Sequence, residues 1–296
     1  MTSPFRICSP RGLASVLFAI VLGVAGGCAS RPEAPILEQP GGSAVAQTAS
    51  QLDALLPADV LLVGEQHDAA EHQQIEQQVV SVLASRGLLA ALVLEMADAG
   101  VSTASLKPSA TEEQTRRALK WDDKAWPWQA YGPAVMTAVR AGVPVLGGNL
   151  PREAMPASMN DSKLDAQLPG PALKAQQQGI RIGHCNLLPE SQIQPMTRIQ
   201  IARDISMATT LGQAVLPGKT VVLLSGNGHA DRKLGVPQHL RADLKAKAIQ
   251  LRAGDASTSE SADAVWSTPA LPEIDHCDSL RRQFAPRSGS GPEVKP

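Results

Sequence analysis

VLLVGEQHD (residues 60–68) places four apolar residues directly before a turn that carries a glutamate, a histidine and an aspartate. Three other stretches repeat this arrangement: LVLEM (92–96), VPVLGGN (143–149) and VVLLSGNGH (221–229). Each apolar run is continuous rather than alternating, which is typical of strands that are buried on both faces of a parallel sheet. The four stretches therefore predict strands of a parallel sheet that are buried on both faces, as in an α/β fold.

Helical patterns lie between these strands. The segment from Ile75 to Leu83 repeats apolar residues at the spacing of a buried helical stripe, and a second helix is expected from Pro195 to Leu211. Strands that alternate with helices predict an open, mostly parallel sheet flanked by helices. The long interval between the second and third strands predicts a helical excursion there.

Composition bounds the possible functions. The chain has 296 residues, 43% of them hydrophobic, with 27 basic and 28 acidic side chains. A near-neutral chain with this hydrophobic content is not a disordered polyelectrolyte, and it lacks the basic excess of a nucleic-acid-binding surface. We therefore expect no nucleic acid among its partners. The length suits one large domain or two small ones.

The N-terminus predicts export and lipid anchoring. The apolar run LASVLFAIVLGV (residues 13–24) follows two arginines and is shorter than the roughly 20 residues that a spanning helix needs, so residues 1–27 are interpreted as a signal peptide. VAGGC (24–28) resembles a bacterial lipobox, which makes Cys28 the acylated, palmitate-bearing residue. Ala29 then implies sorting to the outer membrane, on its periplasmic side.

Domain boundaries follow from these segments. Residues 28–50 contain three prolines and a glycine pair and are expected to form a flexible tether. The folded domain is predicted over residues 51–270. Residues 271–296 are expected to form a C-terminal extension whose end is disordered.

Polar residues follow every predicted strand, and ligands of open α/β sheets lie beyond the carboxyl ends of the strands. This rule brings Glu65, His67, Glu95, Asn149 and His229 to one edge. The ordinary preference of turns for asparagine explains Asn149. It does not explain two glutamates and two histidines, so the edge is a candidate site.

Six ordered motifs support one family. They are GEQHD (64–68), LEM (94–96), GGNLPRE (147–153), GHC (183–185), ARDISMA (202–208) and SGNGHADRKLGVP (225–237). Together they resemble the ChaN family of bacterial lipoproteins, in the haem-binding uptake Tiki superfamily. The resemblance covers roughly residues 51–254, and it implies an α/β fold and a role in haem or iron acquisition. The same superfamily also contains metalloproteases and hydrolases.

Four aromatic residues lie close together in an otherwise aromatic-poor chain: Trp121, Trp126, Trp128 and Tyr131. Tyr131 is the only tyrosine, and a phenolate is a suitable ligand for ferric haem. We therefore expect Tyr131 to ligate the haem iron, with Trp128 on the same helical face. Alternatively, these aromatic side chains only anchor a helical segment onto the core.

Other residues complete the expected haem site. His67 is expected close to the iron, and His184 is a further cofactor-binding candidate in a loop. Arg140 and Arg152 are candidates for the haem propionates. A stripe on the second helix that includes Arg203 either faces this site or lies in solvent.

A hydrolase is the alternative function. Glu65, His67, Glu95 and His229 would supply ligands for a divalent metal ion such as zinc or manganese. A metal-free version would use His67 as the general base and Glu65 to orient it, which makes these two the candidate catalytic residues. A third possibility is an envelope interaction protein without activity. We prefer a non-enzymatic haem-binding protein.

The remaining partners follow from the cysteines and the anchor. Cys8 leaves with the signal peptide and Cys28 is acylated, so Cys185 and Cys277 are expected to form a disulfide in an oxidising compartment. The expected partners are haem, the membrane through the lipid anchor, and a second copy of the chain in a homodimer.

Overall fold

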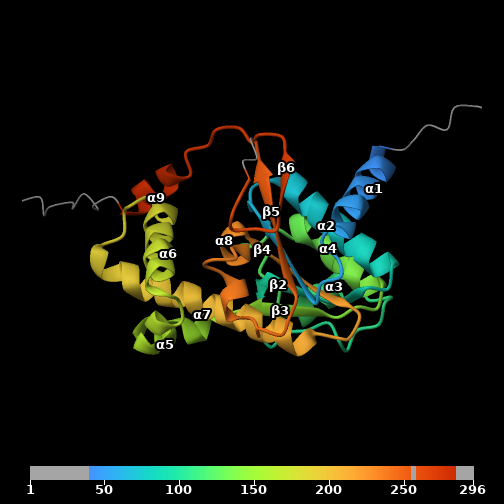
Figure 1. Cartoon of the computed structure of the whole chain (residues 1–296), viewed down its shortest axis with the longest axis horizontal. Helices are drawn as coiled ribbons and strands as arrows, with labels where there is room; N and C mark the ends of the chain where they lie inside the picture. Colours follow the sequence, from blue (N-terminus) through green and yellow to red (C-terminus); the bar gives the residue numbers. More distant parts are fainter. Residues whose placement is uncertain (1–39, 255–257, 285–296) are drawn as a thin grey trace, which may run out of the picture. The chain divides into compact units, whose positions relative to one another are not determined.

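The computed structural model describes residues 40–254 and 258–284. Its named strands form one sheet of six parallel strands in the order β3-β2-β4-β1-β5-β6 (Figure 1). They are β1 Val60–Glu65, β2 Leu89–Asp98, β3 Val145–Asn149, β4 Thr220–Gly226, β5 Ala246–Ala253 and β6 Ala264–Thr268. The predicted fold class, an α/β domain with an open parallel sheet, is confirmed.

Helices connect the strands as the sequence predicts. They are α1 Pro40–Asp53, α2 Ala70–Ser85, α3 Glu112–Ala118, α4 Trp128–Arg140, α5 Met155–Asn160, α6 Gly170–Gly183, α7 Glu190–Ala214, α8 Asn227–Ala230 and α9 Cys277–Phe284. Short 3₁₀ turns are η1 Arg152–Ala154, η2 Ser162–Ala166 and η3 Val236–His239. The helices α3 and α4 form the expected excursion between β2 and β3.

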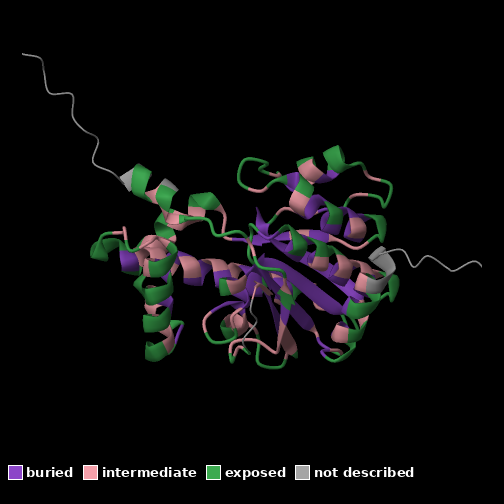
Figure 2. Ribbon diagram, turned by 90° about the horizontal axis from the view of Figure 1, so that it is seen from above, coloured by how far each residue is buried: buried purple, intermediate pink, exposed green. Residues whose placement is uncertain are grey.

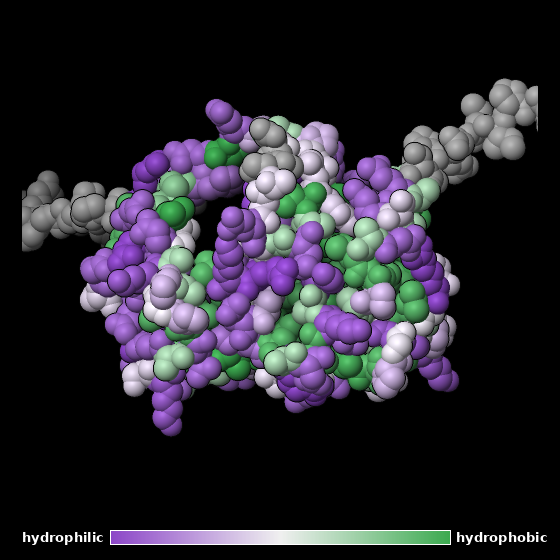
Figure 3. Space-filling view, in the orientation of Figure 1, coloured by the Kyte–Doolittle hydropathy of each residue, from purple (hydrophilic) through white to green (hydrophobic). Residues whose placement is uncertain are grey.

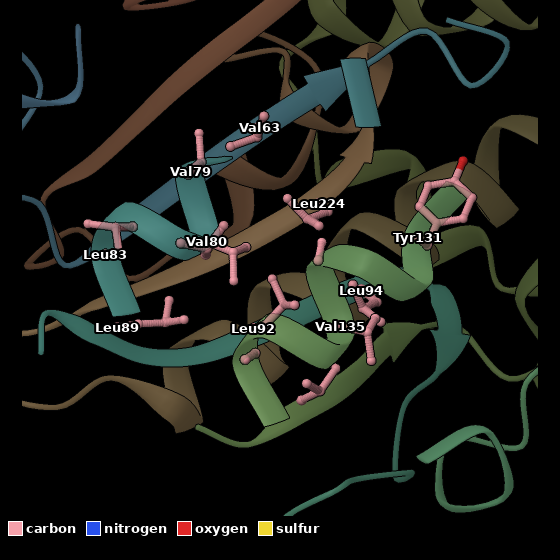
Figure 4. Close-up of a cluster of buried hydrophobic side chains, with 14 of the residues drawn as sticks. Val63, Val79, Val80, Leu83, Leu89, Leu92, Leu94, Tyr131, Val135 and Leu224 are labelled. Atoms are coloured by element: carbon pink, nitrogen blue, oxygen red, sulfur yellow. The ribbon is translucent and has the colours of Figure 1, made fainter. Parts of the chain in front are cut away.

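Both faces of the sheet are covered, which explains the continuous apolar runs (Figure 2). On one face, Val63, Leu94 and Leu224 pack against α2 and α4, as Figure 4 shows. On the other face, Leu62 and Leu223 pack against α7 and α8. The central strands are therefore fixed from both sides, and their carboxyl ends form a rigid edge.

The helix α1 corrects the predicted boundary between tether and domain. Residues 40–50 belong to α1 rather than to a flexible tether. Thr48 is buried and donates a hydrogen bond to Gln78 of α2, and Leu52 is fully buried in the core. This packing stabilises the helix, although the glycines and prolines of the segment disfavour one. The signal peptide, Cys28 and the rest of the tether lie outside the described residues.

The C-terminal extension crosses from β6 to the turn between α6 and α7. Cys277, at the start of α9, forms a disulfide with Cys185. This is the pair that is expected from the sequence. His276 lies 3.4 Å from the carboxylate of Asp68, in the turn after β1. Figure 3 shows an opening beneath this crossing segment, between α6 and the sheet. The predicted disordered end, residues 285–296, lies outside the described residues.

Within the described residues, the helices are too short or too polar to cross a membrane.

Candidate functional site

Two buried glutamates at the carboxyl edge of the sheet organise the site from opposite faces. Glu65 ends β1 and is 2% exposed, and its carboxylate contacts side chains from α2 and α4. Glu95 lies in β2 and is 4% exposed, and its carboxylate contacts α8. The carboxyl ends of neighbouring parallel strands place these two groups at one edge, as the sequence predicts.

Glu65 is the centre of the first half of the site. The hydroxyl of Tyr131 donates to its Oε1 at 2.7 Å, and the amide of Gln73 donates to its Oε2. The Nδ1 atom of His67 lies 2.8 Å from the same Oε1. Both oxygens of this buried carboxylate are therefore hydrogen-bonded, which is the condition for keeping a charge inside a protein.

Glu76 lies one turn after Gln73 on α2 and is fully buried. Within the described residues, neither of its carboxyl oxygens has a hydrogen-bond partner. Burial, together with the charges of Glu65 and Glu95, raises the pKa of Glu76 well above its usual range. We infer that this carboxyl group is protonated and adds no charge to the cluster.

His229 is the centre of the second half. Its Nδ1 lies 2.6 Å from a carboxylate oxygen of Asp204 on α7, and its Nε2 lies 3.2 Å from Oε1 of Glu95. Because both ring nitrogens face carboxylates, the ring donates from both and is an imidazolium. Burial alone would lower the pKa of His229, but Glu95 and Asp204 outweigh it and raise the pKa to about 10.

Glu95 is held as an anion by the same contacts. Burial would raise its pKa, but His229 lowers the pKa to about 2, and the backbone N–H of Gly226 donates to Oε2 at 2.8 Å. Asn149 donates to the backbone carbonyl of Glu95 at 2.8 Å and so fixes the end of β2. The polar turn after β3 therefore supports the end of β2, and Asn149 also lines the pocket described below.

His67 joins the two halves and is the exposed member of the cluster. Its side chain is 41% exposed, and its Nε2 lies 4.0 Å from Oε2 of Glu95. The ring packs edge-on against Trp126, with 4.9 Å between ring centres. A Cβ atom on Gly226 would lie 2.9 Å from Nε2, so glycine is needed there to leave room for the ring.

The state of the His67 ring follows from these contacts. Burial would lower its pKa, but the hydrogen bond with Glu65 and the charge of Glu95 raise it overall. In the neutral ring, the proton on Nδ1 is held by Glu65, and Nε2 carries the lone pair.

A pocket of about 520 Å³ opens beside His67, along the end of β2 and the segment between α3 and α4. Its volume lies within the range of about 300–1,000 Å³ that small-molecule sites occupy. Glu95 and Trp126, which contact His67, form part of its wall. The rest of the lining combines apolar side chains, cations and carboxylates. They include Met96, Leu119, Met155, Lys120, Arg152, Arg203, Asp98, Asp122 and Glu153.

The sequence model of the family described as haem-binding uptake, Tiki superfamily, ChaN matches residues 51–240. The chain belongs to this family. The chain is similar to the solved structure of ChaN of Campylobacter jejuni, which shows cofacial haem binding. The sequence identity is 26% and the TM-score is 0.60. That match covers 70% of this chain and 87% of the Campylobacter chain.

Other comparisons add little. The type III effector HopBA1 is 19% identical, with a TM-score of 0.45 over 76% of this chain and 94% of the effector, and we infer nothing from this likeness. No curated protein matches the chain at a significant level.

In this ChaN family member, the predicted iron ligand Tyr131 is buried in the core. Figure 4 shows Tyr131 on α4 among buried hydrophobic side chains. The residue is 1% exposed, and its hydroxyl donates to Glu65. Burial, together with Glu65, raises the pKa of the phenol far above its ordinary value, which disfavours a phenolate. Direct ligation by Tyr131 would require the ring to leave the core.

The aromatic cluster also differs in detail from the expectation. Trp128 is buried and donates from Nε1 to Glu112, whereas Trp126 packs on His67 and lines the pocket. Trp126 precedes α4 and therefore lies in the loop at the sheet edge, while Trp128 begins the helix and packs edge-on against Trp121.

The structure does not bring His184 to this edge. It caps the C-terminus of α6, where its Nδ1 bonds to the carbonyl of Ile180 at 2.8 Å. In Figure 1, α6 lies apart from the sheet. Arg140, at the end of α4, does not line the pocket either, whereas Arg152 does.

The alternative metal site is not assembled as a ligand cage. Glu65, His67, Glu95 and His229 do come together, but both nitrogens of His229 are taken by carboxylates. Within the described residues there is no group of three or more His, Cys, Asp or Glu side chains arranged to hold a metal ion. The sequence missed Gln73 and Trp126 as members of the site, because neither belongs to a strand-end motif.

Proposed function

We propose that this protein binds haem in the bacterial cell envelope for haem or iron uptake, with Nε2 of His67 as the iron ligand. The observation that carries the proposal is the pairing of His67 with Glu65. This pairing fixes the ring and leaves Nε2 as the other ring nitrogen, 4.0 Å from Oε2 of Glu95, which lines the pocket. Histidines that ligate metals generally donate their other N–H to a carboxylate or carbonyl in this way.

The surroundings of His67 fit a haem group. A bound haem would bring an iron that accepts the imidazole lone pair, a flat apolar ring and two carboxylates. Trp126 and Met96 supply apolar surface beside His67, and Arg152 and Arg203 supply cations. Tyr131 acts on the ligand indirectly, because its hydroxyl helps to hold the Glu65 carboxylate that orients His67.

Membership of the ChaN family and the similarity to a haem-binding ChaN of Campylobacter jejuni support this proposal. The envelope location rests on the signal sequence and on Cys28, both outside the described residues. A lipid anchor at Cys28 would hold the domain at the outer membrane, on the periplasmic side.

The test is an absorbance titration of the purified mature chain with ferric haem. We expect a Soret band with the features of histidine ligation. His67→Ala should lose this spectrum, and Tyr131→Phe should keep it because the phenol does not touch the iron. His184→Ala is the matched control, since this histidine lies on α6 and is expected to leave binding unchanged.

Two results would contradict the proposal. If Tyr131→Phe loses the spectrum while His67→Ala keeps it, Tyr131 is the iron ligand. If the wild-type chain binds no haem, haem binding is wrong, and metal-free hydrolysis with His67 as base becomes the candidate. That alternative predicts ester hydrolysis that His67→Ala abolishes.

A further inference from the structure

The turn between β1 and α2, residues 66–69, carries His67 and is held by groups outside it. Gln66 lies at its start, and its side-chain Oε1 accepts the backbone N–H of Ala253, at the end of β5, at 2.8 Å. The carbonyl of Gln66 accepts the backbone N–H of Ala69 at 3.0 Å. The direction in which His67 leaves the turn therefore depends on how Gln66 is fixed.

The third contact of Gln66 comes from His72, in the first turn of α2. The backbone N–H of Gln66 donates to Nδ1 of His72 at 3.0 Å. On the other side of the ring, Nε2 lies 3.1 Å from Oγ1 of Thr268, the last residue of β6. The side chain of His72 is fully buried, and both of its ring nitrogens have a partner.

These partners fix the state of the His72 ring. A backbone N–H can only donate, so Nδ1 is the unprotonated nitrogen, and the proton lies on Nε2 and is donated to Thr268. Burial lowers the pKa of His72, against the charges of three nearby carboxylates, namely Glu65, Asp68 and Glu71. The ring is therefore neutral, and one tautomer joins the turn to the edge strand β6.

We propose that His72 is a positioning residue for His67, acting through the backbone of Gln66. The inference rests on the proposed function for the role of His67 as iron ligand. Gln66 lies between Glu65 and His67 in the chain, so its backbone sets where the ring stands relative to the carboxylate that orients it. Thr268 holds the ring of His72 in turn, so that β6, two strands away from β1, takes part in setting the site.

Hydrogen exchange in the haem-free mature chain tests the contact directly. Asparagine in place of His72 can set an amide oxygen where Nδ1 lies, whereas glutamine reaches the position of Nε2. Relative to the amides within β1, the amide of Gln66 should exchange as in the wild type in His72→Asn and about tenfold faster in His72→Gln. Thr48→Val is the matched control, because it removes another buried hydrogen bond to α2, at Gln78, and should leave the Gln66 amide unchanged.

The wild type offers a measurement that needs no variant to fold. In ¹⁵N-labelled protein, the amide nitrogen of Gln66 and Nδ1 of His72 should show a nuclear magnetic coupling across their hydrogen bond. The nitrogen shifts of the ring should identify Nε2 as the protonated nitrogen. A ring that is protonated at Nδ1 would overturn the inference.

A titration with ferric haem then tests positioning itself. His72→Asn should keep the wild-type spectrum and affinity, and His72→Gln should bind about tenfold more weakly and lose intensity in the histidine-ligated Soret band. Both variants remove the buried imidazole, so a merely structural role would affect them alike. Thr48→Val should bind haem as the wild type does.

Equal exchange at Gln66 in the two His72 variants would overturn the inference, and so would equal haem affinity. The result is separable from that of the proposed function. If the wild type binds no haem, or if His67→Ala binds it unchanged, the proposed iron ligand is wrong, while the exchange data still decide whether His72 holds the turn. If His67 ligates haem but the two His72 variants bind it alike, only the role of His72 is wrong.

Discussion

Replacing His229 with glutamine should lower the free energy of unfolding. The imidazolium lies between Glu95 and Asp204, all three being buried. Glutamine keeps a polar side chain but removes the positive charge, and it leaves two buried carboxylates without a cation. Breaking a buried ion pair by removing one partner costs about 3–5 kcal/mol.

The pKa of His229 gives a second route to the same magnitude. The pKa rises from 6.5 to about 10 on folding, so the folded state binds the proton more tightly. The stabilisation is complete below the unfolded pKa and is lost as pH rises through the folded value. At about 1.4 kcal/mol per unit, roughly 4 kcal/mol is present at pH 7 and little remains near pH 10.

Thermal unfolding followed by circular dichroism between pH 7 and pH 10 tests this reasoning. At pH 7 the variant should melt roughly 8–16 °C below the wild type, taking about 2–4 °C per kcal/mol for a domain of this size. The difference between the two proteins should shrink towards pH 10. His239→Gln is the control, because burial lowers the pKa of this half-buried histidine.

A constant difference in melting temperature from pH 7 to pH 10 would show that His229 is not an imidazolium in the folded protein. A variant that melts at the same temperature as the wild type at pH 7 would show the same.

Three further outcomes are expected. Gly226→Ala should weaken haem binding at least severalfold, because the new Cβ would lie 2.9 Å from Nε2 of His67; unchanged affinity in a titration would contradict this. Denatured, non-reduced protein should contain no free thiol at Cys185 or Cys277, and reduction should release two, as a thiol assay can count. Cys28→Ala should move the protein from the detergent phase to the aqueous phase, and a wild type that is already aqueous would exclude the anchor.

The sequence predicts the strand-end residues well because strand ends are local features. A short, continuous apolar run before a polar turn favours a strand that is buried on both faces, so β1, β2 and β4 follow from the local pattern. The run VPVL also forms a strand, β3, but β3 lies at the edge of the sheet. β5 (residues 246–253) escapes prediction because its sequence, AKAIQLRA, mixes charged and apolar residues, and only its middle is buried. Its identity depends on pairing with β1, which no local pattern reveals.

The helical members of the site are harder to predict. Asp204 meets His229 because of how α7 lies across the sheet, and a one-residue rotation would turn it away. Trp126 and Trp128 are two residues apart, yet only Trp126 reaches the pocket, since Pro127 ends the loop and α4 begins directly after it. The contact between Tyr131 and Glu65 is hard to predict for a related reason. The position of Tyr131 on α4 directs its hydroxyl towards Glu65, and the amino-acid composition does not reveal this direction.

The parallel order of the strands also decides when the site comes into existence during synthesis. Glu65 and His67 belong to the first strand to emerge, but β4 must insert between β1 and β2 before Gly226 and His229 can reach Glu95. Until then, the nascent chain contains Glu65 and Glu95, which are buried in the folded protein, without the cation of His229 beside Glu95. A ribosome-bound fragment that ends before Gly226 should therefore lack the site altogether, and ligand binding would appear abruptly, as a late event in the making of the chain.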